Sequence, residues 1–122
     1  MKKRVLCVDD VASNLDLMRQ VVAQMNRYEV VAVSSSQAAL AEVAQQAFDL
    51  VLMDLLMPQM DGYALVAQLR NLPELKDCQY MAVSAQVSDA THVKCLAAGF
   101  GHYVTKPFDI HELQALIARL LD

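Results

Sequence analysis

Short apolar runs alternate with segments of helical spacing along the whole chain. The runs are rich in Val, Leu and Met, and they occupy residues 4–8, 30–33, 50–53, 80–84 and 102–105. Runs of this length between polar or glycine-containing segments are typical of buried strands. We therefore expect five β-strands at these positions.

The segments between the runs carry apolar residues at the three- and four-residue spacing of an amphipathic helix. The expected stripes are Val11, Leu15, Met18, Val22 and Met25; Ala38, Ala41 and Val43; Leu65, Val66 and Leu69; residues 89–98; and Ile110, Leu113, Leu116, Ile117 and Leu120. Gly99 follows the fourth stripe and suits a left-handed helix cap. Asp109 with Glu112 resembles a capping box at the start of the fifth helix.

Strands that alternate with helices indicate βα units and a parallel sheet. Parallel strands are covered on both faces, which explains their nearly continuous apolar character. Right-handed crossovers then give an α/β fold, a three-layer doubly wound (βα)5 sandwich. In such a sheet the carboxyl ends of all strands lie along one edge, where ligands bind.

Composition narrows the function classes. The 122 residues are 56% hydrophobic and carry a net charge of -4, with one basic run at residues 2–4. The absence of a basic stripe argues against direct nucleic-acid binding. No apolar stretch reaches the roughly 18 residues that span a bilayer, so we expect a cytoplasmic protein. Cys7, Cys78 and Cys95 lack metal-type spacing and are expected to be reduced thiols.

The candidate chemistry stands where the predicted strands end. Asp9 and Asp10 follow the first strand, Asp54 follows the third, Ser84 ends the fourth and Lys106 follows the fifth. Clustered carboxylates repel one another unless a cation is present, and Mg²⁺ prefers oxygen ligands. A phosphoryl group is stabilised by a metal, a Lys and a hydroxyl. The edge therefore predicts Mg²⁺-assisted phosphoryl transfer, with the central carboxylate, Asp54, as the nucleophile.

Four motifs in this order make the chain similar to a known family. They are Val8-Asp9-Asp10, the segment from Leu52 to Gly62, Val83-Ser84-Ala85, and Tyr103-Val104-Thr105-Lys106-Pro107. Together they resemble the response-regulator receiver domains of two-component signalling, over residues 4–122. The resemblance implies one receiver domain over residues 1–122. It also implies a flavodoxin-like parallel sheet with strand order 2-1-3-4-5.

The resemblance also implies a set of metal ligands. Asp54 would be the phosphoacceptor and would bind Mg²⁺ directly, together with Asp10 and the backbone carbonyl of Leu56. Asp9 would act mainly through a metal-bound water. Mn²⁺ is the alternative ion.

Three further residues take roles by resemblance. Lys106 would pair with a phosphoryl oxygen, Ser84 would turn its hydroxyl toward the phosphoryl group, and Tyr103 would follow inward as a switch. The Lys106–Pro107 bond would be cis. Switching would act through the face formed by the fourth helix, the fifth strand and the fifth helix.

The function implied is that of a phosphoacceptor signalling domain, which assists its own phosphorylation and dephosphorylation and is not classed as an enzyme. Its partners would be a histidine kinase or histidine phosphotransfer protein and a downstream protein target. The protein itself would be a monomer or a phosphorylation-dependent dimer. The alternatives are a receiver fragment of a hybrid histidine kinase or larger regulator and a phosphorylation-independent interaction module. An aspartyl-phosphate phosphatase would need D-x-D-G-T, which Asp9-Asp10-Val11-Ala12-Ser13 does not match. A flavin-binding protein would need a phosphate-binding loop where the acidic pair stands.

Two expectations concern single positions. Leu56 and Gln86 lie two residues past Asp54 and Ser84, near the path of an attacking water, and apolar Leu56 is expected to slow hydrolysis. The histidines are too scattered for a metal site and are expected at the surface or partly packed; they are His92, His102 and His111.

Overall fold

The five predicted apolar runs form the strands of one parallel sheet. The computed structural model describes residues 2–55, 62–85 and 88–122, apart from the side chain of Asp89. The strands are β1 (Arg4–Val8), β2 (Glu29–Val33), β3 (Leu50–Asp54), β4 (Gln79–Ser84) and β5 (His102–Thr105). The helices are α1 (Ala12–Ala23), α2 (Ser36–Gln45), α3 (Gly62–Arg70), α4 (Asp89–Ala98) and α5 (Ile110–Leu121), with a short 3-10 helix, η1, at Pro73–Leu75.

The strand order is β2-β1-β3-β4-β5, as predicted. Every neighbouring pair is parallel, and the register aligns the carboxyl ends: Val8 pairs with Met53, Asp54 with Val83, and Ser84 with Thr105. β3 is therefore the central strand, and its last residue lies between the ends of β1 and β4.

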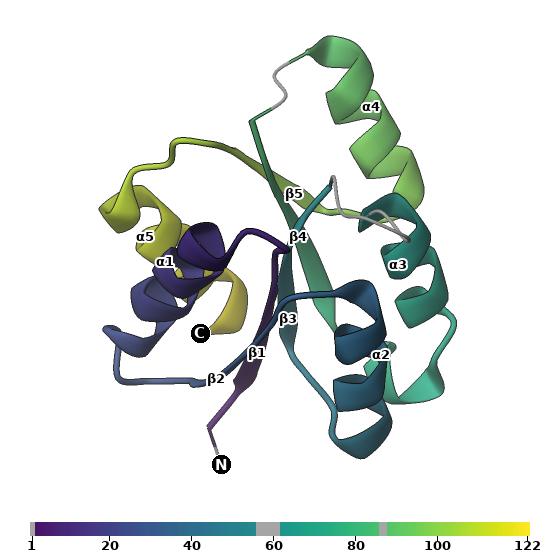
Figure 1. The fold of residues 1–122 in the computed structure, drawn as a ribbon, viewed down its shortest axis with the longest axis horizontal. Helices are drawn as coiled ribbons and strands as arrows, with labels where there is room; N and C mark the ends of the chain where they lie inside the picture. The colour runs from purple at the N-terminus through teal and green to yellow at the C-terminus, as the bar shows by residue number, and fades with distance from the viewer. Residues whose placement is uncertain (1, 56–61, 86–87) are drawn as a thin grey trace.

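The helices cover both faces of the sheet and complete the expected three layers. Helices α1 and α5 lie on one face, and α2, α3 and α4 lie on the other (Figure 1). Alternate residues of the strands point to opposite faces of the sheet and belong to two hydrophobic clusters. Met53 and Ala82 pack with α2, α3 and α4, whereas Leu52 and Val83 pack with α1 and α5. The sheet thus separates the core into two halves.

Helix ends follow the expected chemistry. Gly99 has φ +115° at the C-cap of α4, a left-handed conformation that glycine adopts readily. The side chain of Asp109 accepts a 2.9 Å hydrogen bond from the N–H of Glu112 at the start of α5. Ser35 and Ser88 cap α2 and α4 in the same way. The predicted bounds of α4, β1 and β5 agree with the structure.

The start of the first helix differs from the predicted stripe. Val11 precedes α1 and is 46% exposed, while Met18, Val21 and Val22 form the buried face. The N–H of Val11 donates a 2.9 Å hydrogen bond to the Asp9 carboxylate, which turns the chain out of β1 before the helix begins. Local hydrogen bonding, not apolar spacing, therefore sets the position of Val11.

The cysteines are free thiols, as predicted. Burial raises the pKa of the Cys7 thiol from 9.0 to about 12, and burial raises the pKa of Cys78 to about 12 as well. Both thiols therefore remain protonated and pack as small apolar groups near neutral pH. Among the described residues, every helix is too short or too polar to cross a bilayer.

Candidate functional site

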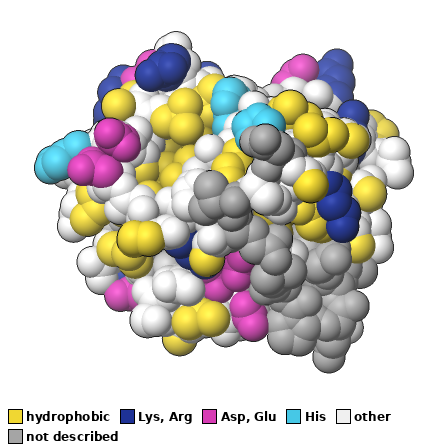
Figure 2. Space-filling model, turned by 90° about the horizontal axis from the view of Figure 1, so that it is seen from above, with side chains coloured by type: hydrophobic (Ala, Val, Ile, Leu, Met, Phe, Trp, Pro, Cys, Tyr) yellow, Lys and Arg dark blue, Asp and Glu magenta, His cyan; other side chains and the backbone are white. Residues whose placement is uncertain are grey.

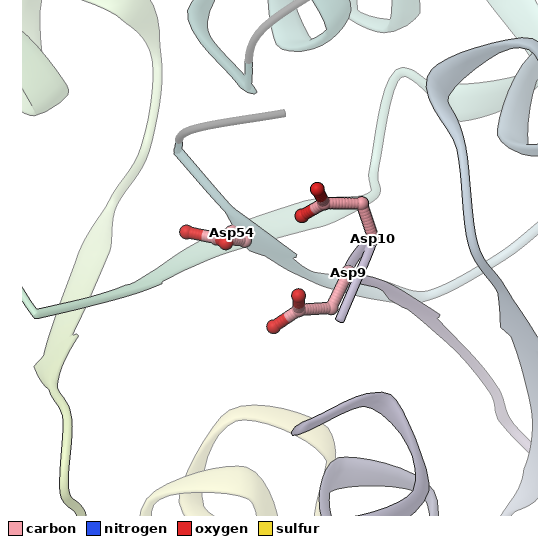
Figure 3. Close-up of side chains that lie close together, drawn as sticks. All are labelled: Asp9, Asp10 and Asp54. Atoms are coloured by element: carbon pink, nitrogen blue, oxygen red, sulfur yellow. The ribbon is translucent and has the colours of Figure 1, made fainter. Parts of the chain in front are cut away.

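Three carboxylates from two strand ends meet at the carboxyl edge of the sheet. Asp9 and Asp10 follow β1, Asp54 ends β3, and one oxygen from each lies within 4.8 Å of the others. Figure 3 shows the three carboxylates pointing to the same side of the strand ends. The predicted gathering of these residues is therefore present in the structure.

Asp9 is the most buried member of the group, with no exposed surface. Its Oδ1 accepts a hydrogen bond from the N–H of Val11 at 2.9 Å, and its Oδ2 accepts one from Nζ of Lys106 at 2.8 Å. A buried carboxylate needs such partners because burial of an unpaired charge is costly. Asp10, in contrast, is exposed and can reach a bound ion from the solvent side.

Lys106 connects the fifth strand to the acidic group. Its N–H donates a 2.8 Å hydrogen bond to the carbonyl of Ser84, which fixes the chain just after β5 against the end of β4. Its Nζ lies 3.7 Å from Oδ2 of Asp54 and nearer to Asp9. The Lys106–Pro107 peptide bond is cis, as the resemblance implied.

Asp54 is less exposed than its place at a strand tip suggests, with 13% of its side chain accessible. The first residue of α3, Gly62, packs against it: a Cβ at this position would lie 2.7 Å from the Asp54 carbonyl oxygen and 3.0 Å from Cα of Leu55. The N–H of Gly62 also donates a 2.9 Å hydrogen bond to the Leu55 carbonyl. Gly62 was not expected at the site, although a glycine at the start of a helix is a signal of close backbone approach.

Ser84 and Tyr103 lie on the last two strands of the sheet, β4 and β5. Ser84 is 1% exposed and ends β4. The hydroxyl of Tyr103 is buried and makes no hydrogen bond within the described part of the chain. Burial and the neighbouring Cys95 raise the pKa of Tyr103, and the Ser84 hydroxyl partly offsets that rise. Tyr103 therefore already points inward, toward Ser84.

Some predicted positions lie outside the described residues. They are Leu56, whose backbone carbonyl was expected to bind the metal, and Gln86, expected near the attacking water. The structure thus gives no information on the expectation that Leu56 slows hydrolysis.

The acidic group opens to the surface at the carboxyl edge. Seen onto this edge, Asp and Glu side chains gather near the middle of the face, beside the part of the surface that is not described (Figure 2). Lys106 also borders a pocket of about 300 Å³ toward α1. That pocket is lined by Asn14, Leu17, Ala85, Lys106, Pro107 and Phe108. A group carried by another molecule can therefore approach Lys106 and the carboxylates from outside.

The donor set defines the chemistry. The potential ligands found among the described residues are carboxylate oxygens, which suit a hard divalent cation such as Mg²⁺. The ammonium of Lys106 contacts Asp9 and Asp54 and adds a positive charge beside both. A carboxylate beside a cation site and an ammonium group is suited to accept a phosphoryl group, because both positive charges stabilise the phosphoryl oxygens.

A further contact was not foreseen from the sequence. The ring of His92, in the first turn of α4, lies against the ring of Tyr103, with centroids 5.9 Å apart and planes at 57°. Spacing within α4 places His92 on the exposed side, and only the three-dimensional arrangement brings it to β5. No motif in the sequence marked this pair.

Comparison with known proteins identifies the family. The model of the response regulator receiver domain matches residues 5–118. The chain is 36% identical over 119 residues to the sensor protein GacS of Pseudomonas syringae pv. syringae, covering 95% of this chain and 13% of that protein. It thus spans only a small part of that relative's length.

Solved structures share the whole fold. The chemotaxis protein CheY4 of Vibrio cholerae superposes with a TM-score of 0.91 at 26% identity, covering 99% of this chain and 100% of that one. The receiver domain of sensor histidine kinase PA1611 from Pseudomonas aeruginosa PAO1 gives a TM-score of 0.88 at 26% identity, covering 99% and 98%. That structure has a magnesium ion coordinated in its active-site cleft.

Proposed function

The chain belongs to the response regulator receiver domain family, and we propose that it accepts a phosphoryl group on Asp54 from a histidine kinase or a histidine phosphotransfer protein. Receiver domains are signalling domains of two-component systems. One observation carries the assignment to Asp54. This residue ends the central strand, gathers with Asp9 and Asp10, and lies 3.7 Å from the ammonium group of Lys106, which also contacts Asp9.

We assign a Mg²⁺ ion to the acidic group, with Mn²⁺ as the alternative. The oxygen-only donor set fits this ion, and magnesium is present in the active-site cleft of the PA1611 receiver domain. Asp10 and Asp54 would bind it directly, and buried Asp9 would act through a water. The fourth proposed ligand is the backbone carbonyl of Leu56, outside the described residues. When bound, the ion would neutralise negative charge on the phosphoryl oxygens.

The chain's own residues carry out the transfer. A carboxylate oxygen of Asp54 attacks phosphorus, the phosphorus–nitrogen bond of the donor phosphohistidine breaks, and its electron pair stays on the imidazole. Lys106 would pair with a phosphoryl oxygen, because its ammonium already lies between Asp9 and Asp54. The Ser84 hydroxyl would donate to another phosphoryl oxygen from the adjacent strand end.

The same groups support removal of the phosphoryl group, which ends the signal. Water attacks phosphorus of the acyl phosphate, the oxygen–phosphorus bond to Asp54 breaks, and inorganic phosphate leaves. The domain thus assists its own phosphorylation and dephosphorylation while serving as a signalling module and not as a free-standing enzyme.

Partner binding is proposed to change at the face formed by α4, β5 and α5. Ser84 and Tyr103 connect this face to the site. The face offers apolar surface: Val93 and Leu96 on α4 are 65% and 54% exposed, and a pocket of about 320 Å³ lies between β5 and α5. A downstream protein that prefers one arrangement of this face would respond to phosphorylation.

The whole chain, residues 1–122, is proposed to be a single receiver domain. A receiver segment of a hybrid histidine kinase or larger regulator is the strongest alternative context, because GacS is a sensor protein in which this sequence covers 13% of the length. A phosphorylation-independent interaction module is the other. Three further properties stay predictions. They are a cytoplasmic location, a monomeric or phosphorylation-dependent dimeric state, and the lack of nucleic-acid and membrane partners.

The test is phosphorylation by a small-molecule phosphodonor. Incubation with acetyl phosphate and Mg²⁺ is expected to add one phosphoryl mass that is labile to base. Asp54→Ala should abolish the gain, and the control Asp16→Ala, on the exposed face of α1, should retain it. A phosphorylated Asp54→Ala protein, or a wild-type protein that stays unmodified beside an active kinase and Mg²⁺, would refute the proposal.

A further inference from the structure

His92 and Tyr103 form a contact between the first turn of α4 and β5. Their ring centroids lie 5.9 Å apart, and the planes are tilted by 57°. The N–H of His92 donates a 3.0 Å hydrogen bond to the carbonyl of the cap residue Ser88, so the imidazole is carried by the first hydrogen-bonded turn of the helix. His92 is exposed, whereas the Tyr103 hydroxyl is buried.

The inward position of Tyr103 needs a stabilising contact. Its hydroxyl is buried, and the Ser84 hydroxyl near it lowers the pKa of Tyr103. Moving a hydroxyl out of water is unfavourable unless other contacts compensate. The ring of His92 provides an aromatic contact with the Tyr103 ring on the α4 side.

We propose that His92 is a positioning residue that holds Tyr103 inward before any phosphoryl group is present. The inference rests on the proposed function, in which Tyr103 connects Ser84 to the partner-binding face. Tilted aromatic pairs change the relative population of two arrangements by about two- to ten-fold. The first turn of α4 thus biases Tyr103 independently of the carboxylates.

This arrangement gives α4 control over Tyr103. Displacement of the first turn of α4 withdraws the imidazole and releases the Tyr103 ring, whereas a partner seated over His92 reinforces the inward position. Because such coupling is reciprocal, a change in Tyr103 alters the affinity of a partner bound at α4 by the same factor. Phosphorylation then acts on a Tyr103 that already faces Ser84.

The experiment measures the solvent accessibility of Tyr103 in the unphosphorylated protein without metal. The four tyrosines are labelled with 3-fluorotyrosine, the Tyr103 signal is assigned with Tyr103→Phe, and a soluble paramagnetic agent reports exposure by fluorine NMR. The wild-type Tyr103 signal is expected to be protected. His92→Ala should lose this protection, and His92→Phe should restore it because an aromatic ring is retained.

His111→Ala is the matched control, since His111 is an exposed histidine on α5, and it should leave the Tyr103 signal unchanged. Thermal unfolding of each variant confirms that the fold persists. A Tyr103 signal that stays protected in His92→Ala overturns the proposal, as does an unprotected signal in the wild-type protein.

Addition of beryllofluoride with Mg²⁺, which mimics the phosphoryl group, separates this inference from the proposed function. Restored protection of Tyr103 in His92→Ala supports the link between the site and the ring. Failure of the wild-type protein to bind beryllofluoride counts against the phosphoacceptor role alone, because the unphosphorylated proteins already test His92.

Discussion

Lys106 donates a 2.8 Å hydrogen bond to Asp9, a carboxylate with no exposed surface. This bond joins the chain after β5 to the chain after β1, across the ends of β3 and β4. Lys106 therefore has two tasks: it compensates a buried negative charge, and it holds an ammonium group near Asp54.

Lys106→Ala is expected to destabilise the metal-free protein by about 3 kcal/mol, because removal of one partner leaves the Asp9 charge buried and uncompensated. Urea unfolding in the presence of a chelator measures the change. The double variant Asp9→Asn/Lys106→Ala should recover part of the lost stability, because the buried charge is removed as well. An exposed lysine gives the control, and Lys76→Ala should change stability by less than about 0.5 kcal/mol. Equal stability of Lys106→Ala and Lys76→Ala would contradict this account.

Mg²⁺ is expected to stabilise the folded protein, since the carboxylates repel one another without it. At a concentration about 100 times its dissociation constant, an ion that binds only the folded state adds about 2.7 kcal/mol. Asp54→Asn should be more stable than the wild type without metal and should gain less from Mg²⁺. Urea unfolding with and without Mg²⁺ measures both effects. Asp16→Asn, outside the group, should gain as much as the wild type; an undiminished gain in Asp54→Asn argues against the site.

Gly62→Ala is expected to disturb the site from its backbone side. The added Cβ would meet the Asp54 carbonyl oxygen at 2.7 Å, a distance that backbone atoms must shift to relieve. We expect a loss of about 2 kcal/mol in stability and weaker Mg²⁺ binding, measured by unfolding and by titration with the metal. Gly101→Ala is the control, because its Cβ would meet nothing within 4 Å. Similar effects of the two substitutions would rule out the role given to Gly62.

Stability is expected to fall in alkaline solution because of the buried thiols. In the folded protein the pKa of Cys7 and that of Cys78 are each raised to about 12 by burial, from 9.0. Above pH 9 the unfolded chain therefore binds fewer protons than the folded one. The contribution is fully present below pH 9 and is lost as the pH rises toward 12, at up to about 1.4 kcal/mol per pH unit for each thiol.

Urea unfolding at pH 8 and pH 10.5 tests this dependence in the wild type and in Cys78→Ala. The variant should lose about 1–2 kcal/mol less than the wild type over this interval, because one buried thiol no longer ionises in the unfolded chain. Identical losses in the two proteins would show that Cys78 does not contribute.

Much of this architecture could be predicted from the sequence, because buried parallel strands and amphipathic helices leave periodic signals. The bounds of β1, β5 and α4 agree with the structure, and Asp9, Asp10 and Asp54 meet as the strand ends predicted. The first residues of two strands were missed: β2 begins at Glu29 and β4 at Gln79, since backbone pairing extends one residue past the apolar run.

Other features could not be read from local patterns. The exposed position of Val11 depends on a hydrogen bond to the Asp9 side chain, and the contact of His92 with Tyr103 depends on how α4 packs beside β5. The close approach of Gly62 to Asp54 is likewise a tertiary relation. Such relations join residues whose separation in the chain carries no periodic signal, and only the folded structure reveals them.

The division of the core by the sheet has a practical consequence for protein engineering. The residues proposed to transmit the signal, Tyr103 and α4, share their apolar layer with α2 and α3, whereas α1 and α5 pack against the opposite side. Substitutions at the buried contacts between α1 and α5 therefore act on the layer that does not contain Tyr103. Resistance to heat or denaturant can be adjusted there without repacking the layer around Tyr103.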